Sequence, residues 1–153
     1  MLTIFSDEYF MKEALKEAQK AFDSDEVPIG AVIVCNNKII ARAHNYTEHL
    51  NDVTAHAEMQ AFTAAANNIG GKYLKECKLY VTLEPCIMCA GASYWTQIGE
   101  IIYGAKDEKR GYSKYSETSG ILHPSCKIRG GVLSEECAEI LQKFFQKKRT
   151  SKI

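Results

Sequence analysis

Hydrophobic side chains first recur at helical spacing near the start of the chain. Ser6 is followed by Asp7 and Glu8, acidic residues that are favourable at the positive end of a helix dipole. Apolar residues then return every three or four positions, at Phe10, Met11, Ala14, Leu15, Ala18 and Phe22. This pattern predicts a helix that is capped by Ser6, ends near Phe22 or Asp23 and buries one face.

Two β-rich runs come next, at residues 32–35 and 38–43, and they are joined by Asn36-Asn37. Because asparagine tolerates the positive φ of tight hairpin turns, this arrangement predicts a β-hairpin. Thr54 is expected to cap a second helix that ends near Asn68, since Gly70-Gly71 provides a stop signal.

Strands and helices alternate in the second half of the chain. Apolar runs at residues 78–82 and 101–103 predict strands, and a third helix is expected between them, from Cys86 to about Gln97. Ser134 is expected to cap the last helix. This alternation predicts an α/β layer structure with parallel neighbours. Residues 106–126 form the longest irregular segment.

The composition is that of an ordinary globular protein. The chain has 153 residues, so we expect one domain spanning 1–153. Hydrophobic residues make up 46% and charged residues 25%, with three prolines, which excludes disordered and collagen-like classes. The N-terminus has no basic region ahead of an apolar one, and no apolar stretch is long enough for a membrane helix. We therefore expect a cytoplasmic protein that does not associate with membranes.

Charge is distributed unevenly along the chain, although the net charge is zero. Residues 1–105 carry 8 basic and 13 acidic side chains, whereas residues 106–153 carry 11 basic and 6 acidic ones. The C-terminal third can therefore present a basic surface to a polyanion. The basic run at residues 147–149 either binds such a partner or offsets the dipole of the last helix.

Four residues indicate a catalytic metal centre: His56, Glu58, Cys86 and Cys89. One imidazole and two thiolates leave a fourth zinc position open, and a separate carboxylate can carry protons. His56 and Glu58 are two residues apart on a predicted helix, so their side chains diverge by about 200° and only His56 is expected to bind metal. Cys86 and Cys89 share one helix face, where both are expected to be deprotonated.

Three other readings of these residues remain open. The cysteines can form a redox pair, or the site can be a structural zinc whose fourth ligand is His44, His49 or His123. The third possibility is core cysteines with no metal. The remaining cysteines are expected to be small buried hydrophobes: Cys35, Cys77, Cys126 and Cys137.

The chain resembles the bacterial tRNA-specific adenosine deaminases of the zinc-dependent cytidine deaminase superfamily over nearly its full length. The paired H-x-E and P-C-x-x-C motifs are the signature of these zinc deaminases. The other matching stretches are residues 26–31, Asn45, residues 54–58, 79–92 and 102–107, and the segments 136–138 and 144–145 of the last helix.

This resemblance implies a three-layer α/β/α fold with a mixed five-stranded sheet, a homodimer and one Zn²⁺ per subunit. It implies that His56, Cys86 and Cys89 hold the zinc and that Glu58 shuttles protons. The implied reaction is hydrolysis of adenosine to inosine at A34, the wobble position of a tRNA anticodon stem-loop.

The resemblance also implies four substrate contacts. Asn45 would bond the flipped base, Val27 would line its pocket, the Ala57 N–H would contact the base edge, and Asp107 would reach a neighbouring ribose. Purely structural roles compete with these: a turn cap for Asn45, core packing for Val27 and a solvated loop position for Asp107.

The loop after Asp107 departs from the family pattern. It has tyrosines where the family usually has small residues, and its aromatic and basic side chains could stack on bases and follow phosphates: Tyr112, Tyr115, Lys109, Arg110 and Lys114. Tyr94-Trp95 is similar to guanine deaminases, so a deaminase of a free nucleobase or nucleoside is the second hypothesis. A non-catalytic zinc-containing RNA-binding module is the third, and Glu58 argues against it because a structural site needs no spare carboxylate.

Overall fold

One mixed sheet organises the computed structural model, which describes residues 5–115 and 120–151. Its strands lie in the order β2-β1-β3-β4-β5. Their bounds are Gly30–Cys35 (β1), Lys38–His44 (β2), Cys77–Leu83 (β3), Glu100–Ala105 (β4) and Lys127–Arg129 (β5). β1 is antiparallel to both of its neighbours, while β3, β4 and β5 run parallel. The parallel pairing predicted for the second half of the chain is therefore confirmed, as is the antiparallel hairpin of β1 and β2.

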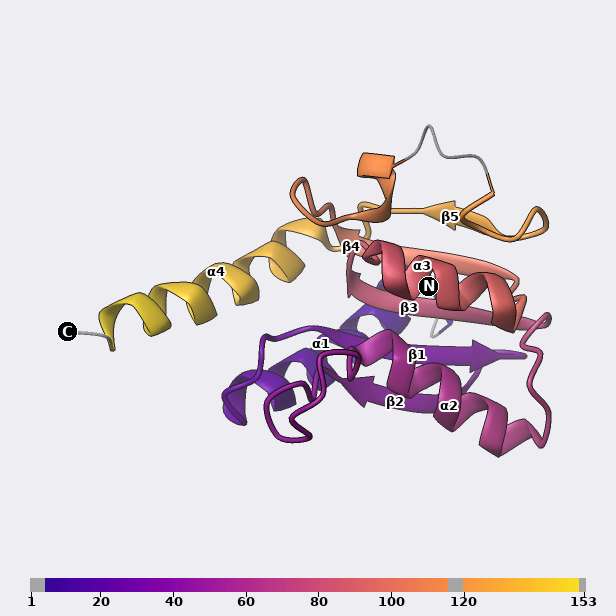
Figure 1. Cartoon of the computed structure of the whole chain (residues 1–153), viewed down its shortest axis with the longest axis horizontal. Helices are drawn as coiled ribbons and strands as arrows, with labels where there is room; N and C mark the ends of the chain where they lie inside the picture. Colours follow the sequence, from indigo (N-terminus) through magenta and orange to yellow (C-terminus); the bar gives the residue numbers. More distant parts are fainter. Residues whose placement is uncertain (1–4, 116–119, 152–153) are drawn as a thin grey trace.

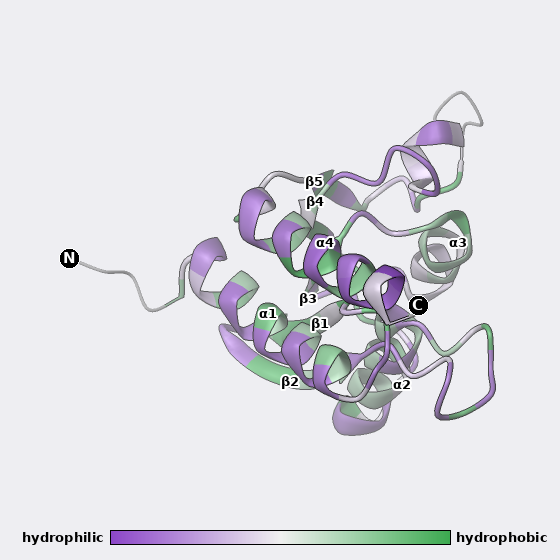
Figure 2. Ribbon diagram, turned by 90° about the vertical axis from the view of Figure 1, so that its left-hand side faces the viewer, coloured by the Kyte–Doolittle hydropathy of each residue, from purple (hydrophilic) through white to green (hydrophobic). Residues whose placement is uncertain are grey.

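Helices cover both faces of this sheet. They are α1 (Asp7–Asp23), α2 (Ala57–Ile69), α3 (Ile87–Thr96) and α4 (Ser134–Thr150), with a short 3₁₀ helix, η1, at Tyr112–Tyr115. α2 and α3 lie in front of the sheet in Figure 1, and in Figure 2 the strands lie between these helices and the pair α1 and α4. The predicted three-layer α/β/α fold with a five-stranded sheet is confirmed.

The strands are apolar on both faces because each face packs against helices. In β1, Ile33 faces the core formed with α2, while Val32 and Val34 face the core formed with α1. In β3, Tyr80 belongs to the α1 side and its neighbours to the α2 side. Alternation along a strand thus places apolar side chains in two separate cores.

Two local predictions near the N-terminus are confirmed. The Ser6 side chain accepts a hydrogen bond from the Tyr9 N–H (3.1 Å), which caps α1. Asn36 and Asn37 both have positive φ, 52° and 62°, in the turn between β1 and β2. These values are typical of the two-residue turn that the sequence predicts.

Two predicted caps are wrong. Thr54 lies outside α2, because Asp52 competes for it: the Asp52 carboxylate accepts hydrogen bonds from the Thr54 hydroxyl (2.7 Å) and N–H (2.9 Å). His56 occupies the cap position and forms no side-chain cap bond. Ser134 is the first residue of α4, and the residue before it has a left-handed conformation, with φ of 53° at Leu133.

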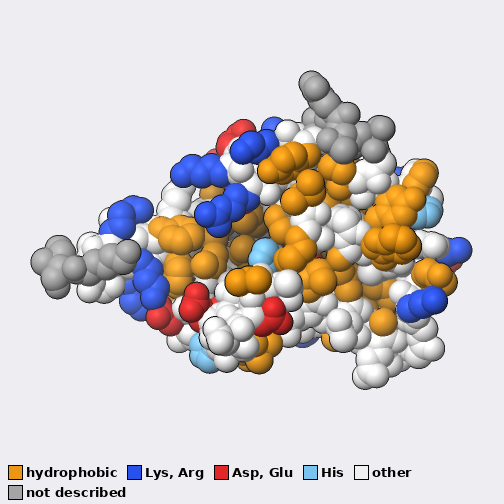
Figure 3. All heavy atoms as spheres, in the orientation of Figure 1, with side chains coloured by type: hydrophobic (Ala, Val, Ile, Leu, Met, Phe, Trp, Pro, Cys, Tyr) orange, Lys and Arg blue, Asp and Glu red, His pale blue; other side chains and the backbone are white. Residues whose placement is uncertain are grey.

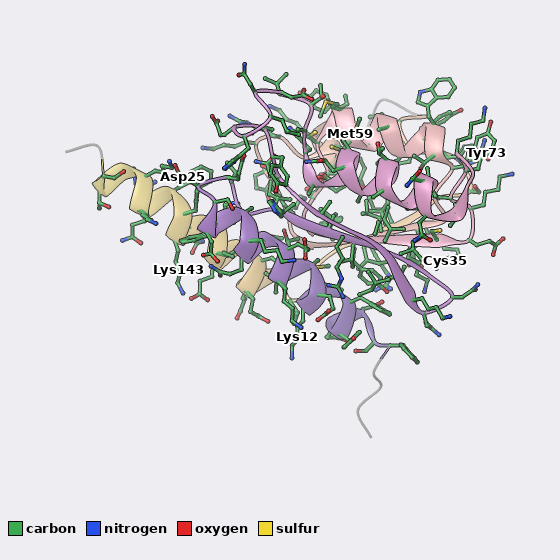
Figure 4. All side chains as sticks on the ribbon, turned by 90° about the horizontal axis from the view of Figure 1, so that it is seen from below. Lys12, Asp25, Cys35, Met59, Tyr73 and Lys143 are labelled. Carbon is green, nitrogen blue, oxygen red and sulfur yellow. The ribbon has the colours of Figure 1, made fainter. Side chains whose placement is uncertain are left out.

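The segment expected to be irregular at residues 106–126 contains η1, and its residues 116–119 lie outside the described part of the chain. β5, which follows it, was not predicted. At the other end of the fold, α4 packs beside α1: Lys148 pairs with Asp25 (2.6 Å), which Figure 4 labels at the end of α1. Over residues 5–115 and 120–151, no helix is both long and apolar enough to span a membrane.

Candidate metal centre

The starts of two helices bring the predicted metal ligands together. His56 lies directly before α2, Cys86 directly before α3, and Cys89 in the first turn of α3. The His56 Nδ1 atom is 3.7 Å from the Cys86 sulfur and 3.5 Å from the Cys89 sulfur. The three potential ligand atoms lie within 4.8 Å of one another. His56 is therefore close to two residues that are thirty or more positions away in the sequence.

This donor set fits zinc. One imidazole and two sulfurs are preferred zinc ligands, and three protein ligands with an open position are typical of a catalytic site. The histidines that a structural site would recruit have other partners in the structure. His44 Nδ1 bonds the Asn45 carbonyl (3.0 Å), His49 bonds Glu26, and His123 bonds a serine hydroxyl (2.7 Å). Within the described ranges, none of them joins the cluster.

Electrostatics at the cluster favour a thiolate. The pKa of Cys86 is lowered to about 4, first by a hydrogen bond from the Cys89 thiol and also by His56. The pKa of Cys89 is raised because it shares its proton with Cys86 and is buried. The Cys86 thiolate in turn raises the pKa of His56. A dication held by both sulfurs would displace the shared proton. Deprotonation of both cysteines in the metal-bound site stays a prediction.

Glu58 lies beside the cluster but outside it. It is in the first turn of α2 and only 4% exposed. Burial is the main reason that its pKa is raised to about 7, and the negative charge on Cys86 adds to the effect. A carboxyl group with a pKa near neutrality can both accept and donate a proton at neutral pH.

The predicted substrate contacts lie in two parts of the fold, near the starts of β1 and α2 and on the loop after β4. Asn45 is buried, and its N–H donates to the Ile29 carbonyl (3.1 Å), while the half-buried Val27 accepts from the Ile29 N–H (2.8 Å). These two residues therefore lie together at the start of β1. Ala57 is the first residue of α2, so its N–H is one of the free donors at that helix end.

Asp107 lies on the loop after β4, and its carboxylate is used within that loop. It accepts hydrogen bonds from the N–H groups of Lys109 and Arg110, both 3.1 Å. The same loop carries the half-buried Tyr112 and the exposed Tyr115 of η1. The Tyr112 N–H donates to the carbonyl of Pro85 (2.8 Å), next to the ligand Cys86.

Two buried acids with structural roles were missed in the sequence. Glu26 accepts hydrogen bonds from the N–H groups of Glu48 (3.0 Å) and His49 (2.8 Å). Burial alone would raise the pKa of Glu26, but these bonds lower it. Glu84 accepts in the same way from Asp107 and Ser113. Glu26 follows a polar segment and Glu84 an apolar strand, so the two share no sequence signal beyond an acidic residue beside a motif.

Comparison with known proteins gives one family model and several full-length relatives. The model of the cytidine and deoxycytidylate deaminase zinc-binding region matches residues 5–105. A tRNA-specific adenosine deaminase of Aquifex aeolicus is 45% identical over 147 residues, which cover 94% of this chain and 97% of that protein.

Two solved structures are informative. One, from a study of A-to-I editing by tRNA:A34 deaminases at the wobble position, is 43% identical with a TM-score of 0.82, covering 87% of this chain and 99% of its own. A guanine deaminase of Bacillus subtilis is 35% identical with a TM-score of 0.64, covering 74% of this chain and 70% of its own.

Proposed function

We propose that this chain, which belongs to the tRNA-specific adenosine deaminases of the cytidine and deoxycytidylate deaminase family, hydrolyses adenosine to inosine at position 34 of a tRNA anticodon loop. Water adds at C6 of the adenine ring, and the amino group leaves as ammonia. The base must leave the anticodon stack to reach the recessed cluster, which is the usual route for enzymes that modify a base.

His56, Cys86 and Cys89 would hold one Zn²⁺ per subunit. When bound, zinc lowers the pKa of a coordinated water towards neutrality and so makes it nucleophilic. The protein supplies the orientation: both sulfurs come from the rigid start of α3, and the imidazole comes from the start of α2.

Glu58 would carry the protons. As a carboxylate it accepts a proton from the attacking water and delivers it to the ring nitrogen. It then takes the proton of the hydroxyl group added at C6 and delivers it to the departing amine. The observation that carries the proposal is its position, because Glu58 is buried in the first turn of α2, two residues from His56, yet is not one of the clustered ligands. Neither a structural metal site nor a redox pair of cysteines requires a buried carboxyl group that does not bind the metal.

Base recognition would use residues near the starts of β1 and α2 and on the loop after β4. Asn45 would bond the base, Val27 would line its pocket and the Ala57 N–H would donate to its edge, while Asp107 would reach a neighbouring ribose. The exposed basic side chains of Lys109, Arg110 and Lys114 lie on the same loop as Asp107 and are suited to phosphate contacts.

The direct test is to incubate the zinc-loaded protein with an anticodon stem-loop that carries A34. Ammonia release and conversion of A34 to inosine, read as guanosine on sequencing, are the expected results. Guanine, adenine and cytosine are tested in parallel, since a guanine deaminase shares the fold and 35% of the aligned sequence. Ammonia from a free base alone would overturn the RNA substrate but not the deaminase chemistry.

The matched control is Glu58→Ala. This variant should keep its zinc, because Glu58 is not among the clustered ligands, and should lose deamination by about 10²-fold or more, the usual contribution of a general acid–base group. Full activity in a zinc-loaded Glu58→Ala protein would show that the proton-carrier role is wrong.

A homodimer is also proposed. The outer side of α2 and α3 exposes apolar side chains that water-soluble monomers rarely gather in one place: Ile69, Tyr73, Ile87 (44% exposed) and Trp95 (78% exposed). Figure 3 shows hydrophobic side chains over this face. Light scattering should give twice the 17.1 kDa chain mass, and Trp95→Glu should give the monomer. A monomeric wild-type protein at micromolar concentration would contradict the proposal.

We also propose that the enzyme acts in the cytoplasm, where its tRNA substrate would be found. None of the six cysteines is in a disulfide, which agrees with a reducing compartment. The metal ligands, the proton carrier and both groups of substrate contacts come from residues 27–107, so we propose that the chain acts as one catalytic domain.

A further inference from the structure

Glu84 is a buried acid that is not a metal ligand, although it is only two residues from Cys86. Its side chain is 2% exposed and lies at the end of β3. One carboxylate oxygen accepts from the Asp107 N–H and the other from the Ser113 N–H, both at 3.0 Å. The Glu84 N–H itself donates to the Ala105 carbonyl (2.8 Å) at the end of β4. One side chain thus bonds two points of the loop that follows β4.

The middle of this loop is also fixed to the cysteine segment. Gly111 forms an isolated antiparallel bridge with Cys86, and the next residue, Tyr112, donates its N–H to the Pro85 carbonyl. A Cβ atom at Gly111 would lie 2.5 Å from a Glu84 oxygen and 2.6 Å from the Asp107 carbonyl oxygen. Only glycine allows the loop to approach Glu84 this closely.

The loop fixed in this way carries the groups proposed to meet the RNA. Asp107 lies near its start, and exposed basic side chains follow at Lys109, Arg110 and Lys114. The loop crosses directly beside Cys86, so its position relative to the metal depends on the Glu84 and Gly111 contacts.

We infer that Glu84 is a positioning residue, which holds the loop 106–115 at a fixed distance from Cys86 so that the RNA contacts and the metal act on one nucleotide. This inference rests on the proposed function for the identity of the substrate. The acid works through the backbone N–H groups of the loop and does not itself touch the substrate.

Glu84→Gln tests the inference with almost no change in volume. The amide keeps one acceptor oxygen but turns an NH₂ group towards the second N–H donor. Zinc content should equal that of the wild type, and hydrogen exchange should rise in peptides covering residues 105–115. KM for the A34 stem-loop should rise about tenfold, because the bound loop geometry is populated less, while kcat changes less than about twofold.

A purely structural role would give a different result. Partial unfolding lowers the active fraction, so kcat would fall and KM would stay constant, which would overturn the inference. The same conclusion would follow if Glu84→Gln left both KM and loop exchange unchanged. Combining it with Asp107→Ala should give a KM increase smaller than the product of the two single increases, because both act on one loop.

Two further variants keep the test decisive. Gly111→Ala displaces the loop without changing Glu84 and should raise KM and loop exchange in the same way. Glu26→Gln is the matched control: it alters a buried carboxylate with two backbone donors, and exchange should rise near Glu48 but not in residues 105–115. Hydrogen exchange and zinc content are measured without RNA, so they test the positioning role of Glu84 independently of deamination. If the wild-type protein left A34 unchanged, only the proposed function would be overturned.

Discussion

The charge state of Glu58 gives a stability prediction that needs no substrate. In an unfolded chain this carboxyl group ionises near its ordinary pKa of 4.5, whereas in the fold, burial raises the pKa to about 7. Between these two pH values unfolding releases a proton, so the folded state is favoured at low pH and loses stability as pH rises towards 7. Glu58→Gln mimics the protonated acid and should escape this loss.

The size of the effect follows from the difference between the two pKa values. A rise from 4.5 to about 7 corresponds to about 3 kcal/mol in the free energy of unfolding. Glu58→Gln and the wild type should therefore be equally stable near pH 4.5. By pH 8 the variant should be more stable by about 3 kcal/mol, since the carboxylate is then fully ionised in the wild type.

Urea unfolding of the metal-free protein in the presence of a chelator, at several pH values from 4.5 to 8, measures this difference. Glu76→Gln, which changes an exposed acid, is the control and should give no pH-dependent difference. If the gap between Glu58→Gln and the wild type were the same at every pH, the buried, protonatable state of Glu58 would be refuted.

Three other predictions concern the metal, the sheet and the basic tail. Cys86→Ala should lose zinc by metal analysis, and full retention would contradict the ligand assignment. Gly30→Ala should destabilise the fold by more than about 2 kcal/mol in urea unfolding, because its methyl group would overlap the Ala14 carbonyl, whereas Gly71→Ala, which faces open space, should not. Removing residues 147–153 should raise KM for the stem-loop and flatten its salt dependence with kcat little changed; an unchanged salt slope would leave only the helix-dipole role.

The sequence predicts most of the helices, the hairpin and the metal ligands because each depends on short-range order. The Asn36-Asn37 turn and the Ser6 cap are set by neighbouring residues, and both are observed. The two parts of the metal site, His56 with Glu58 and Cys86 with Cys89, also depend on short-range order. Residues two or three positions apart at a helix start have fixed relative directions. The match to a family then links the two halves, although His56 and Cys86 are thirty residues apart.

Features that depend on competition or on distant backbone were not predictable in this way. Threonine is a common N-cap residue, but the Thr54 hydroxyl and N–H donate to the Asp52 carboxylate instead. β5 is three residues long and gives no periodic signal. Glu26 and Glu84 accept hydrogen bonds from backbone N–H groups that are between 22 and 29 positions away. Every residue type except proline has such an N–H group, so the loop sequences do not indicate which acid accepts the hydrogen bonds.

The contacts of Glu26 have a consequence for how substrate range can evolve. The carboxylate holds the loop after β2 at its base, through Glu48 and His49, while Leu50 and Val53 further along are exposed and outside both cores. Substitutions at such exposed positions do not move the part of the loop that Glu26 holds, and they leave Asn45 in place. Loop tips can therefore diversify towards new RNA partners while the hydrolytic machinery is inherited unaltered.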